Sequence, residues 1–354
     1  MKAWVLHDIS DLRLETVDRP APLEHEVLVK VMAAGICGSD IPRIYQTGAH
    51  VHPLIPGHEF SGVVVETGDG VDSSWQGQRV GIFPLIPCRS CLPCRKKQFE
   101  MCKNYNYLGS RRDGGFAEYV VVPEENLVRL SDNVTFEEAA MLEPMAVAVH
   151  AMRRIAPKQS DKIAVCGLGT IGLSLFLFLQ EAGFKNIYVF GNKDFQKRTL
   201  MRLGLLEDHY CDILKNDADR WIMDQTEGAG VDVFFECVGK NETLLQAINE
   251  TSFAGRILLV GNPFGDMNLE KAVYWKILRN QLTVMGTWNS SFTGERSDDW
   301  HYVLDRLERR RIAPAELITH RFLLEQLGPG FHIMRDKTED YVKIMAVGAA
   351  AGNE

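Results

Sequence analysis

The sequence has no excess of positive charge and no long apolar run, and each absence removes a class of function. With 39 Lys and Arg against 47 Asp and Glu, the chain of 354 residues carries a formal net charge of -8, which disfavours binding to nucleic acid. The longest apolar run, 171–179, is interrupted by Ser174 and is too short to cross a membrane. The first residues begin a strand-like pattern, and the apolar core of a secretion signal is missing. We therefore expect a cytoplasmic protein without nucleic-acid or membrane partners.

Internal repeats and low-complexity segments are also missing, and the composition is that of a globular protein, with 45% hydrophobic and 24% charged residues. The length suits two domains. Residues 1–145 contain short β-like runs separated by Gly and Pro, which is typical of a mostly antiparallel, barrel-like domain. Between 146 and 290, strand-like and helix-like segments alternate, which predicts parallel βαβ units. Residues 291–354 lose this alternation and are expected to return to the first domain.

Four of the eight cysteines are closely spaced, in the pattern Cys88-x2-Cys91-x2-Cys94-x7-Cys102. Four thiolates can enclose a zinc ion in a closed tetrahedron, which leaves no coordination position for a substrate. This spacing therefore predicts a structural zinc site. The alternatives are a chance run of cysteines and a cluster of disulfides, which the missing secretion signal disfavours.

A glycine-rich turn follows the strand predicted at 162–166. Gly167, Gly169 and Gly172 form a G-x-G-x-x-G motif that opens an apolar helix, which is the context of a dinucleotide site. The first glycine permits the tight turn, the second lets the backbone approach a pyrophosphate, and the third allows close packing of helix on strand. The alternative is a glycine-rich turn in an ordinary α/β domain. The residues predicted to contact the cofactor here are Gly167, Gly169, Thr170, Ile171 and Gly172, with Val260 at the end of a later strand.

The second strand of this domain ends without the acidic residue that NAD-binding chains usually carry for the ribose 2′-hydroxyl. Gly191 stands at that position. A missing carboxylate removes the repulsion that excludes a 2′-phosphate, and a nearby lysine can neutralise one, so we favour NADP over NAD. The alternative is that Asp194 or a looser ribose contact serves NAD. The residues expected around this position are Gly191, Asn192, Lys193, Lys197 and Arg198.

A second set of metal-binding residue types is dispersed over the first domain. It comprises Cys37, His58 and Glu143. One thiolate, one imidazole and one carboxylate can hold zinc and leave a fourth position open for a substrate. Taken singly, His58 is more often a core histidine and Cys37 a buried thiol. Their appearance together with a dinucleotide motif favours a reactive site.

At these residues the chain resembles the zinc-dependent medium-chain alcohol and polyol dehydrogenases, over nearly its whole length. The shared features are G-x-C-G-S-D at 35–40, G-H-E-x-x-G at 57–62, the four-cysteine lobe and the dinucleotide motif. The resemblance implies a GroES-like, mostly-β catalytic domain, a Rossmann domain with a doubly wound parallel sheet, and homodimers or homotetramers. Within the family the chain looks most like the galactitol-1-phosphate 5-dehydrogenases, through segments 37–43, 48–50, 109–119, 276–279 and 286–288.

The same resemblance implies a role for each residue of the reactive site. Cys37 and His58 would bind the catalytic zinc, and Glu143 would be the third ligand. Glu59 would either contact the ligands from behind without binding the metal or be an exchangeable ligand. Ser39 would hydrogen-bond the substrate hydroxyl and pass its proton toward solvent. Zinc would act as a Lewis acid on the alcohol, and hydride would pass to the nicotinamide.

A phosphorylated polyol would require a cationic pocket, because arginine binds phosphate through two parallel hydrogen bonds. Arg43, six residues after Cys37, is expected near the metal. Arg111, Arg112 and His50 are further candidates, although the alternative for the arginine pair is a solvated loop or a subunit contact. An unphosphorylated polyol remains a second possibility. One more residue, Trp288, is expected either at the nicotinamide pocket or in a core.

Two other classes of protein compete with a zinc dehydrogenase. The first is a zinc-independent quinone-type reductase with the same fold, which the second ligand set disfavours. The other is a zinc-ribbon binding module joined to a cofactor-sensing domain, which the acidic charge and the open ligand set disfavour. The two ligand sets predict about two zinc ions per chain, against one for a ribbon alone.

Overall fold

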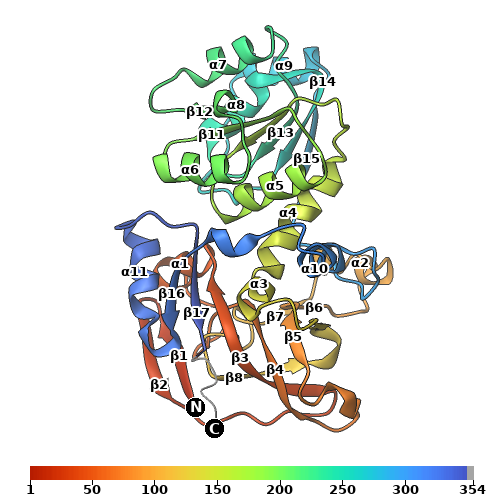
Figure 1. The fold of residues 1–354 in the computed structure, drawn as a ribbon, viewed down its shortest axis with the longest axis vertical. Coiled ribbons are helices and arrows are strands. Elements are labelled where there is room, and N and C mark those ends of the chain that lie inside the picture. The colour runs from red at the N-terminus through yellow and green to blue at the C-terminus, as the bar shows by residue number, and fades with distance from the viewer. Residues whose placement is uncertain (349–354) are drawn as a thin grey trace. The chain divides into compact units, whose positions relative to one another are not determined.

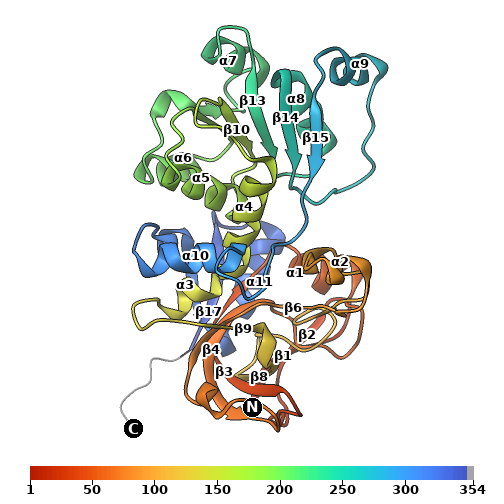
Figure 2. The same ribbon diagram turned by 90° about the vertical axis from the view of Figure 1, so that its right-hand side faces the viewer.

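The computed structural model describes residues 1–348, and the chain divides into two compact units. Unit 1 comprises Met1–Ala146 together with the segment from Ser290 onward, and unit 2 comprises Val147–Asn289. The boundary between them falls inside helix α4 (Leu142–Ile155). In Figures 1 and 2, unit 1 comprises the red-to-yellow part of the ribbon and its darker blue part, and unit 2 runs in colour from yellow-green to light blue.

Unit 1 is built on a seven-stranded, mostly antiparallel sheet in the order β16-β17-β3-β4-β5-β9, with β8 paired to β3. Its long central strands are rich in valine, which fits a pleated and largely buried surface. Two further sheets of two strands each are formed by β1 with β2 and by β6 with β7. The strands of unit 1 are β1 (Lys2–Asp8), β2 (Asp11–Thr16), β3 (Glu26–Ile36), β4 (Glu59–Thr67), β5 (Arg79–Ile82), β6 (Leu85–Ile86), β7 (Asn106–Tyr107), β8 (Tyr119–Pro123), β9 (Leu127–Arg129), β16 (Ile318–Leu323) and β17 (Lys343–Val347). The helices, besides the start of α4, are α1 (Asp40–Pro42), α2 (Leu92–Arg95), α3 (Phe136–Ala140), α10 (Asp299–Glu308) and α11 (Gly328–Asp336).

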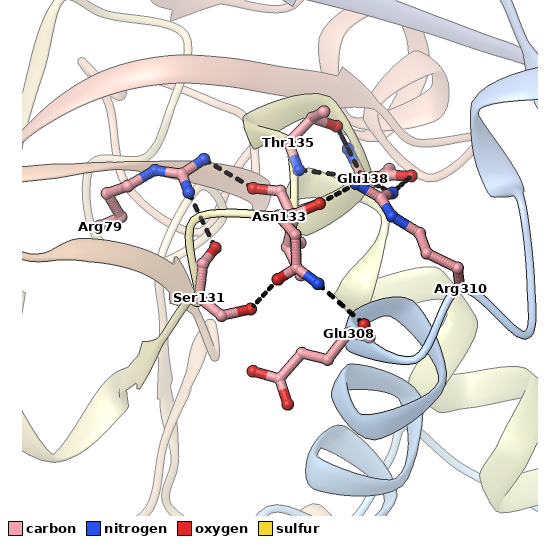
Figure 3. A network of polar contacts seen from close by, with 8 residues as sticks. Arg79, Ser131, Asn133, Thr135, Glu138, Glu308 and Arg310 are labelled. Atoms are coloured by element: carbon pink, nitrogen blue, oxygen red, sulfur yellow. Dashed lines mark hydrogen bonds and ion pairs between the residues drawn. The ribbon is translucent and has the colours of Figure 1, made fainter.

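The C-terminal segment returns to unit 1 and supplies part of its sheet. Strand β17 pairs antiparallel with β3, with Ile344 opposite Ile36. A polar network also joins the end of α10 to the N-terminus of α3: Arg310 Nη1 donates to Glu138 Oε1 at 2.9 Å, and Asn133 Nδ2 donates to the carbonyl of Glu308 at 2.8 Å (Figure 3). Residues far apart in the sequence therefore build one core.

Unit 2 is a six-stranded parallel sheet in the order β12-β11-β10-β13-β14-β15. This is the doubly wound order of a Rossmann domain, with the change of direction between β10 and β13. Every residue of β10 and β11 is buried, as expected for strands covered on both faces. The strands are β10 (Ile163–Cys166), β11 (Ile187–Gly191), β12 (Tyr210–Asp212), β13 (Val231–Glu236), β14 (Thr251–Leu259) and β15 (Thr283–Gly286). The helices are α5 (Thr170–Glu181), α6 (Asp194–Arg202), α7 (Ala218–Gln225), α8 (Asn241–Glu250) and α9 (Lys271–Arg279).

The predicted fold class is confirmed: a mostly-β unit and a parallel Rossmann unit are both present. Within residues 1–348, no helix combines the length and the apolar character needed to pass through a bilayer. Figure 2 shows β13, β14 and β15 side by side in the parallel sheet, with β15 at its edge.

Candidate functional site

The four-cysteine lobe brings its sulfurs together. The Sγ atoms of Cys91 and Cys94 are 3.4 Å apart, those of Cys88 and Cys94 are 3.9 Å apart, and those of Cys91 and Cys102 are also 3.9 Å apart. A tetrahedron with Zn–S bonds of about 2.3 Å places its sulfurs about 3.8 Å apart, whereas a disulfide needs about 2.0 Å. All four thiols are free. The lobe therefore fits a closed zinc site and contains no disulfide.

Cys37, His58 and Glu59 form a second compact donor set, in which one donor atom of each lies within 4.8 Å of the others. The sheet explains this proximity. Cys37 directly follows β3 and His58 directly precedes β4, and the antiparallel register places Gly35 opposite Glu59. Ser39 Oγ donates to Cys37 Sγ at 3.3 Å. A thiolate, an imidazole and a carboxylate on adjacent strand ends suit a zinc ion that keeps an open position.

Asp40 lies behind the imidazole of His58. The distance from its Oδ1 to His58 Nδ1 is 3.4 Å, and both side chains are buried. Arg43 Nη1 donates to the same oxygen at 2.5 Å, and the N–H of Cys37 donates to Oδ2 at 2.9 Å. Burial works against the charge of Asp40, but His58 and Arg43 lower the pKa of its carboxyl. An ionised Asp40 facing Nδ1 leaves Nε2 as the ligand atom of His58.

Glu59 is held from the opposite side by Lys343 of β17. The Lys343 ammonium contacts Glu59 Oε2, and it also donates to the carbonyl of Ile36 at 3.1 Å. The second oxygen, Glu59 Oε1, is buried and has no hydrogen-bond partner among residues 1–348. A buried carboxylate oxygen without a donor is a strong indication that a cation belongs beside it. The sequence analysis missed Lys343, because only the pairing of β17 with β3 brings it here.

Glu143, predicted as the third zinc ligand, is not a member of the compact donor set. It is buried at the start of α4 and accepts a hydrogen bond from the hydroxyl of Tyr107 at 3.2 Å. Burial raises the pKa of Glu143 to about 7; His58 opposes this shift and the carboxylate of Glu59 adds to it. Glu143 therefore lies within electrostatic reach of His58 and Glu59, and its role as a ligand stays a prediction. Tyr107 was also missed from the sequence.

Three of the predicted phosphate-binding residues lie close enough to influence one another. Burial lowers the pKa of His50, and the positive charges of Arg111 and Arg43 lower it further. The guanidinium of Arg111 stacks on the ring of Tyr105, 4.5 Å from its centroid, and its buried Nε has no hydrogen-bond partner in the part of the chain that the structure describes. Arg43 is already paired with Asp40, so Arg111, with its unpaired Nε, is the residue of this group best placed to bind an acidic group.

Arg112, the fourth predicted phosphate-binding residue, has a different environment. Its Nη2 pairs with Glu26 Oε1 at 2.6 Å. The side chain also lines a cavity of about 220 Å³ together with Met1, Leu23 and Tyr119. Arg112 is therefore already neutralised by a carboxylate.

In unit 2, the glycine-rich turn has the local geometry of a pyrophosphate site. Gly167 has a φ of +99°, and a Cβ on Gly172 would lie 1.9 Å from the carbonyl oxygen of Gly167. A Cβ on Gly169, by contrast, would meet no described atom within 4 Å. The turn is thus tight at the first and third glycines and open above the second, where a phosphate would approach. Thr170 is the first residue of α5 and Ile171 is the second.

Glu236, at the end of β13, fixes the loop that packs against this turn. Its Oε1 accepts hydrogen bonds from the N–H groups of Val238 and Gly239 and from the hydroxyl of Thr243, each at 2.8 Å. Its backbone carbonyl accepts from the N–H of Val260, also at 2.8 Å. Sequence reasoning missed Glu236, although an acidic residue that ends a buried strand is a signal that could have found it.

The end of β11 carries several predicted cofactor residues. Asn192 and Arg198 are exposed, and Lys193 is half-buried as the N-cap of α6. Lys197 is already paired: its Nζ lies 2.7 Å from Glu207 Oε1. The loop after β15 carries Trp288, which has 55% of its surface exposed. A core role for Trp288 is therefore excluded, and its place at the nicotinamide pocket stays a prediction.

Comparison with known proteins adds two family matches. Residues 23–132 match the alcohol dehydrogenase GroES-like domain, and residues 170–309 match the zinc-binding dehydrogenase domain. Galactitol 1-phosphate 5-dehydrogenase of Escherichia coli K12 is 32% identical over 84% of this chain and 86% of its own length. L-idonate 5-dehydrogenase of Vitis vinifera is 31% identical, over 92% of this chain and 88% of its own length.

Solved structures give the same result. The crystal structure of galactitol-1-phosphate dehydrogenase from Escherichia coli superposes with a TM-score of 0.90 at 30% identity, covering 98% of this chain and 100% of that chain. A protein described as a zinc-binding dehydrogenase from Sinorhizobium meliloti 1021, bound to NADP, has a TM-score of 0.89 at 27% identity and covers 98% of both chains.

Proposed function

The chain belongs to the family of zinc-binding alcohol and polyol dehydrogenases, and on that premise we propose that it oxidises a secondary alcohol of a polyol phosphate to the ketone, reversibly, with NADP or NAD as hydride acceptor. The observation that carries this proposal is the unpaired Nε of Arg111, beside His50 and Arg43, on the same unit as the Cys37–His58–Glu59 donor set. One of the relatives, galactitol 1-phosphate 5-dehydrogenase of Escherichia coli K12, is named for a substrate of this class.

The residues of unit 1 would divide the work at the reacting hydroxyl. Cys37, His58 and a carboxylate, either Glu59 or Glu143, would hold the zinc ion. When bound, zinc supplies a Lewis acid for the alcohol oxygen, and the nicotinamide supplies the hydride acceptor. Ser39, whose Oγ is 3.3 Å from Cys37 Sγ, would take the alcohol proton and pass it toward solvent.

Asp40 would keep His58 in the tautomer that binds metal. It faces Nδ1 at 3.4 Å and is itself held by Arg43. Arg43 would therefore have two roles, since it positions Asp40 and contributes charge to the phosphate subsite. Arg111 would serve only the phosphate subsite, because its Nε is without a partner in the described chain.

Coenzyme choice follows from the end of β11. Gly191 provides no carboxylate for a ribose hydroxyl, and Lys193 follows two residues later. We therefore favour NADP, which the zinc-binding dehydrogenase of Sinorhizobium meliloti is described as binding. The second zinc ion would be held by Cys88, Cys91, Cys94 and Cys102. Reduced thiols of this kind suit the cytoplasm.

The expected partner in assembly is a second copy of the chain. Strand β15 is the last strand of its sheet, and Val284 on it has 40% of its surface exposed. The neighbouring helix α9 buries none of its residues, and three of its large apolar side chains are about half exposed: Tyr274, Trp275 and Leu278. An exposed edge strand beside apolar side chains favours pairing with another edge. Light scattering of purified protein would test the proposed homodimer, and a Val284→Lys variant would be expected to shift it to monomer.

The proposed reaction is tested by measuring nicotinamide absorbance with a panel of polyols and their phosphates, each with NAD and with NADP. The proposal expects the highest kcat/KM for a polyol phosphate. Higher values for a free polyol such as sorbitol would identify a dehydrogenase of unphosphorylated substrates. Activity that survives removal of both zinc ions would contradict the proposed mechanism.

A further inference from the structure

The absence of a side chain at position 191 has a cause on the neighbouring strand. A Cβ on Gly191 would lie 2.4 Å from the hydroxyl oxygen of Tyr210 and 2.9 Å from its Cζ. It would also lie 2.6 Å from a methyl group of Leu168, in the glycine-rich turn. Real Cβ atoms essentially never show contacts shorter than 3.0 Å. No L side chain therefore fits at position 191 while Tyr210 keeps its place.

Tyr210 is firmly held in this position. It is the first residue of β12, which runs parallel to β11 with Tyr210 opposite Val189. Its side chain is buried, with 8% of the surface exposed, and its hydroxyl donates to the carbonyl of Lys193 at 3.3 Å. The ammonium of Lys197 lies 5.9 Å from the centre of its ring. A different rotamer would lose this burial and the hydrogen bond together.

We propose that Tyr210 is a specificity-determining residue, which keeps position 191 free of a carboxylate and presents a neutral hydroxyl in its place. The proposal rests on the coenzyme use put forward above. A carboxylate at the end of the second strand binds the ribose hydroxyls of NAD and repels the 2′-phosphate of NADP. The neutral phenol of Tyr210 does not repel the 2′-phosphate.

The charge state of the phenol supports this assignment. Burial raises the pKa of Tyr210 to about 12, and Asp212 adds to the shift. The hydroxyl thus stays neutral at physiological pH. It is a hydrogen-bonding group beside Lys193, on the side of the fold where the adenosine ribose of a bound dinucleotide is expected. Gly191 and Tyr210 act as a pair, since an acidic residue can enter at 191 only if the residue at 210 becomes smaller and the terminal methyl group of Leu168 turns aside.

A double-mutant cycle tests this pairing with two independent measurements. The four proteins are the natural chain, Gly191→Asp, Tyr210→Ala and the double variant. For each, the melting temperature is measured without coenzyme, and Kd values for NADPH and NADH are measured by calorimetry. Gly191→Asp alone is expected to lower the melting temperature and weaken both coenzymes. In the Tyr210→Ala background the same aspartate should lower the melting temperature much less, and it should shift the Kd ratio toward NADH by roughly 100-fold.

Control variants separate the steric effect from a general loss of packing. Tyr188 is a buried tyrosine on β11, and none of its atoms is among the three nearest to a Cβ at position 191, so Tyr188→Ala should not relieve Gly191→Asp. Gly191→Ala is the milder probe if the aspartate variant does not fold. It should lower the melting temperature of the natural chain more than that of Tyr210→Ala.

The outcomes distinguish this proposal from the proposed function. Unchanged melting temperatures for Gly191→Ala and Gly191→Asp in the natural background would overturn the role of Tyr210, whatever the enzyme's activity. Equal rescue by Tyr188→Ala would overturn it as well. If the natural chain binds neither coenzyme, the dehydrogenase function fails, and the melting-temperature cycle still decides whether Tyr210 controls position 191. A natural chain that prefers NADH would overturn the assignment of coenzyme choice to this pair.

Discussion

Lys343 and Glu59 form an ion pair inside unit 1, although 284 residues separate them in the sequence. Their side chains have only 2% and 1% of their surface exposed. Burial opposes the charge of Lys343, but Glu59 and Cys37 outweigh it and raise the pKa of the ammonium. The pair thus holds a charged carboxylate beside the proposed zinc ligands in a place where water cannot solvate it.

Replacing Lys343 with Met is expected to leave that carboxylate uncompensated. Breaking a buried ion pair from one side costs about 3–5 kcal/mol. Because a zinc cation can take over the compensation, the loss should be largest after chelation and smaller in the zinc-loaded protein. Denaturant unfolding of both forms measures this difference. The double variant with Glu59→Gln should recover most of the stability, and an equal loss with and without zinc would show that Glu59 does not face the metal.

Replacing one cysteine is expected to lower stability in the four-cysteine ligand set and to abolish activity in the other ligand set. Cys94→Ser should remove the structural zinc and lower the melting temperature, because binding of a structural zinc contributes on the order of 10 kcal/mol to folding. Cys37→Ser should remove or weaken only the other zinc and abolish activity at nearly unchanged stability. Elemental analysis should give about two zinc ions for the natural chain and about one for each variant. Two ions retained in Cys37→Ser would exclude Cys37 as a ligand.

Local sequence patterns were sufficient to predict the fold class. The alternation of strand and helix predicted the parallel unit, the G-x-G-x-x-G motif marked the end of β10, and the cysteine spacing indicated the lobe. These signals depend on neighbours in the sequence, so they can be read without a structure.

The partners of the site residues were harder to predict, because they come from strand pairing. Lys343 reaches Glu59 only through the pairing of β17 with β3, and Tyr210 reaches position 191 only through the pairing of β12 with β11. The sequence shows an absent acid at Gly191 but not the phenol that excludes it. Likewise, Arg111 and Arg112 are equivalent in the sequence, and only the structure shows that Glu26 neutralises one of them.

That difference makes Arg111 the sharper probe of the phosphate subsite. Arg111→Ala should raise KM for a polyol phosphate by roughly 100-fold, since a charged hydrogen-bonded pair contributes about 1.5–3 kcal/mol, and should leave KM for the free polyol nearly unchanged. Arg43→Ala should raise KM more for the phosphate than for the free polyol. It should also lower kcat, because Arg43 holds Asp40. Steady-state kinetics with both substrates separates these effects.

Arg112→Ala is the matched control for the arginine at position 111. Its charge is already paired with Glu26, so the ratio of the two KM values should stay as in the natural chain. If Arg111→Ala changes KM for both substrates equally, the phosphate hypothesis is wrong.

Glu250 gives unit 2 a pH-dependent stability. The residue is fully buried at the end of α8; burial raises its pKa from 4.5 to about 9, against an opposing hydrogen bond from Gln246, and Asp219 adds to the rise. The folded state therefore binds a proton that the unfolded state has lost above pH 4.5. The contribution of protonated Glu250 to the free energy of unfolding is complete below that pH. It falls as the pH rises toward 9, by at most about 1.4 kcal/mol per pH unit.

The Glu250→Gln variant removes this proton linkage. Its melting temperature should fall less between pH 5 and pH 8.5 than that of the natural chain, so that the variant gains relative stability with rising pH. Glu242 lies on the same helix but is exposed, and Glu242→Gln should follow the natural chain at every pH. Parallel curves for the natural chain and Glu250→Gln would show that Glu250 is already ionised in the folded protein.

Glu236 is expected to affect coenzyme binding without touching the coenzyme. Through Oε1 it fixes the loop at Val238 and Gly239, and the Val238 side chain lies where a Cβ on Gly167 would come within 2.7 Å. Loop and turn therefore hold each other's shape. Glu236→Val removes three hydrogen bonds and should raise Kd for the coenzyme by roughly 10-fold or more. Glu236→Gln keeps an acceptor oxygen and should bind nearly normally in calorimetry. Because both variants remove the negative charge, equal weakening would mean that charge, and not the hydrogen-bonded loop, is what the site requires.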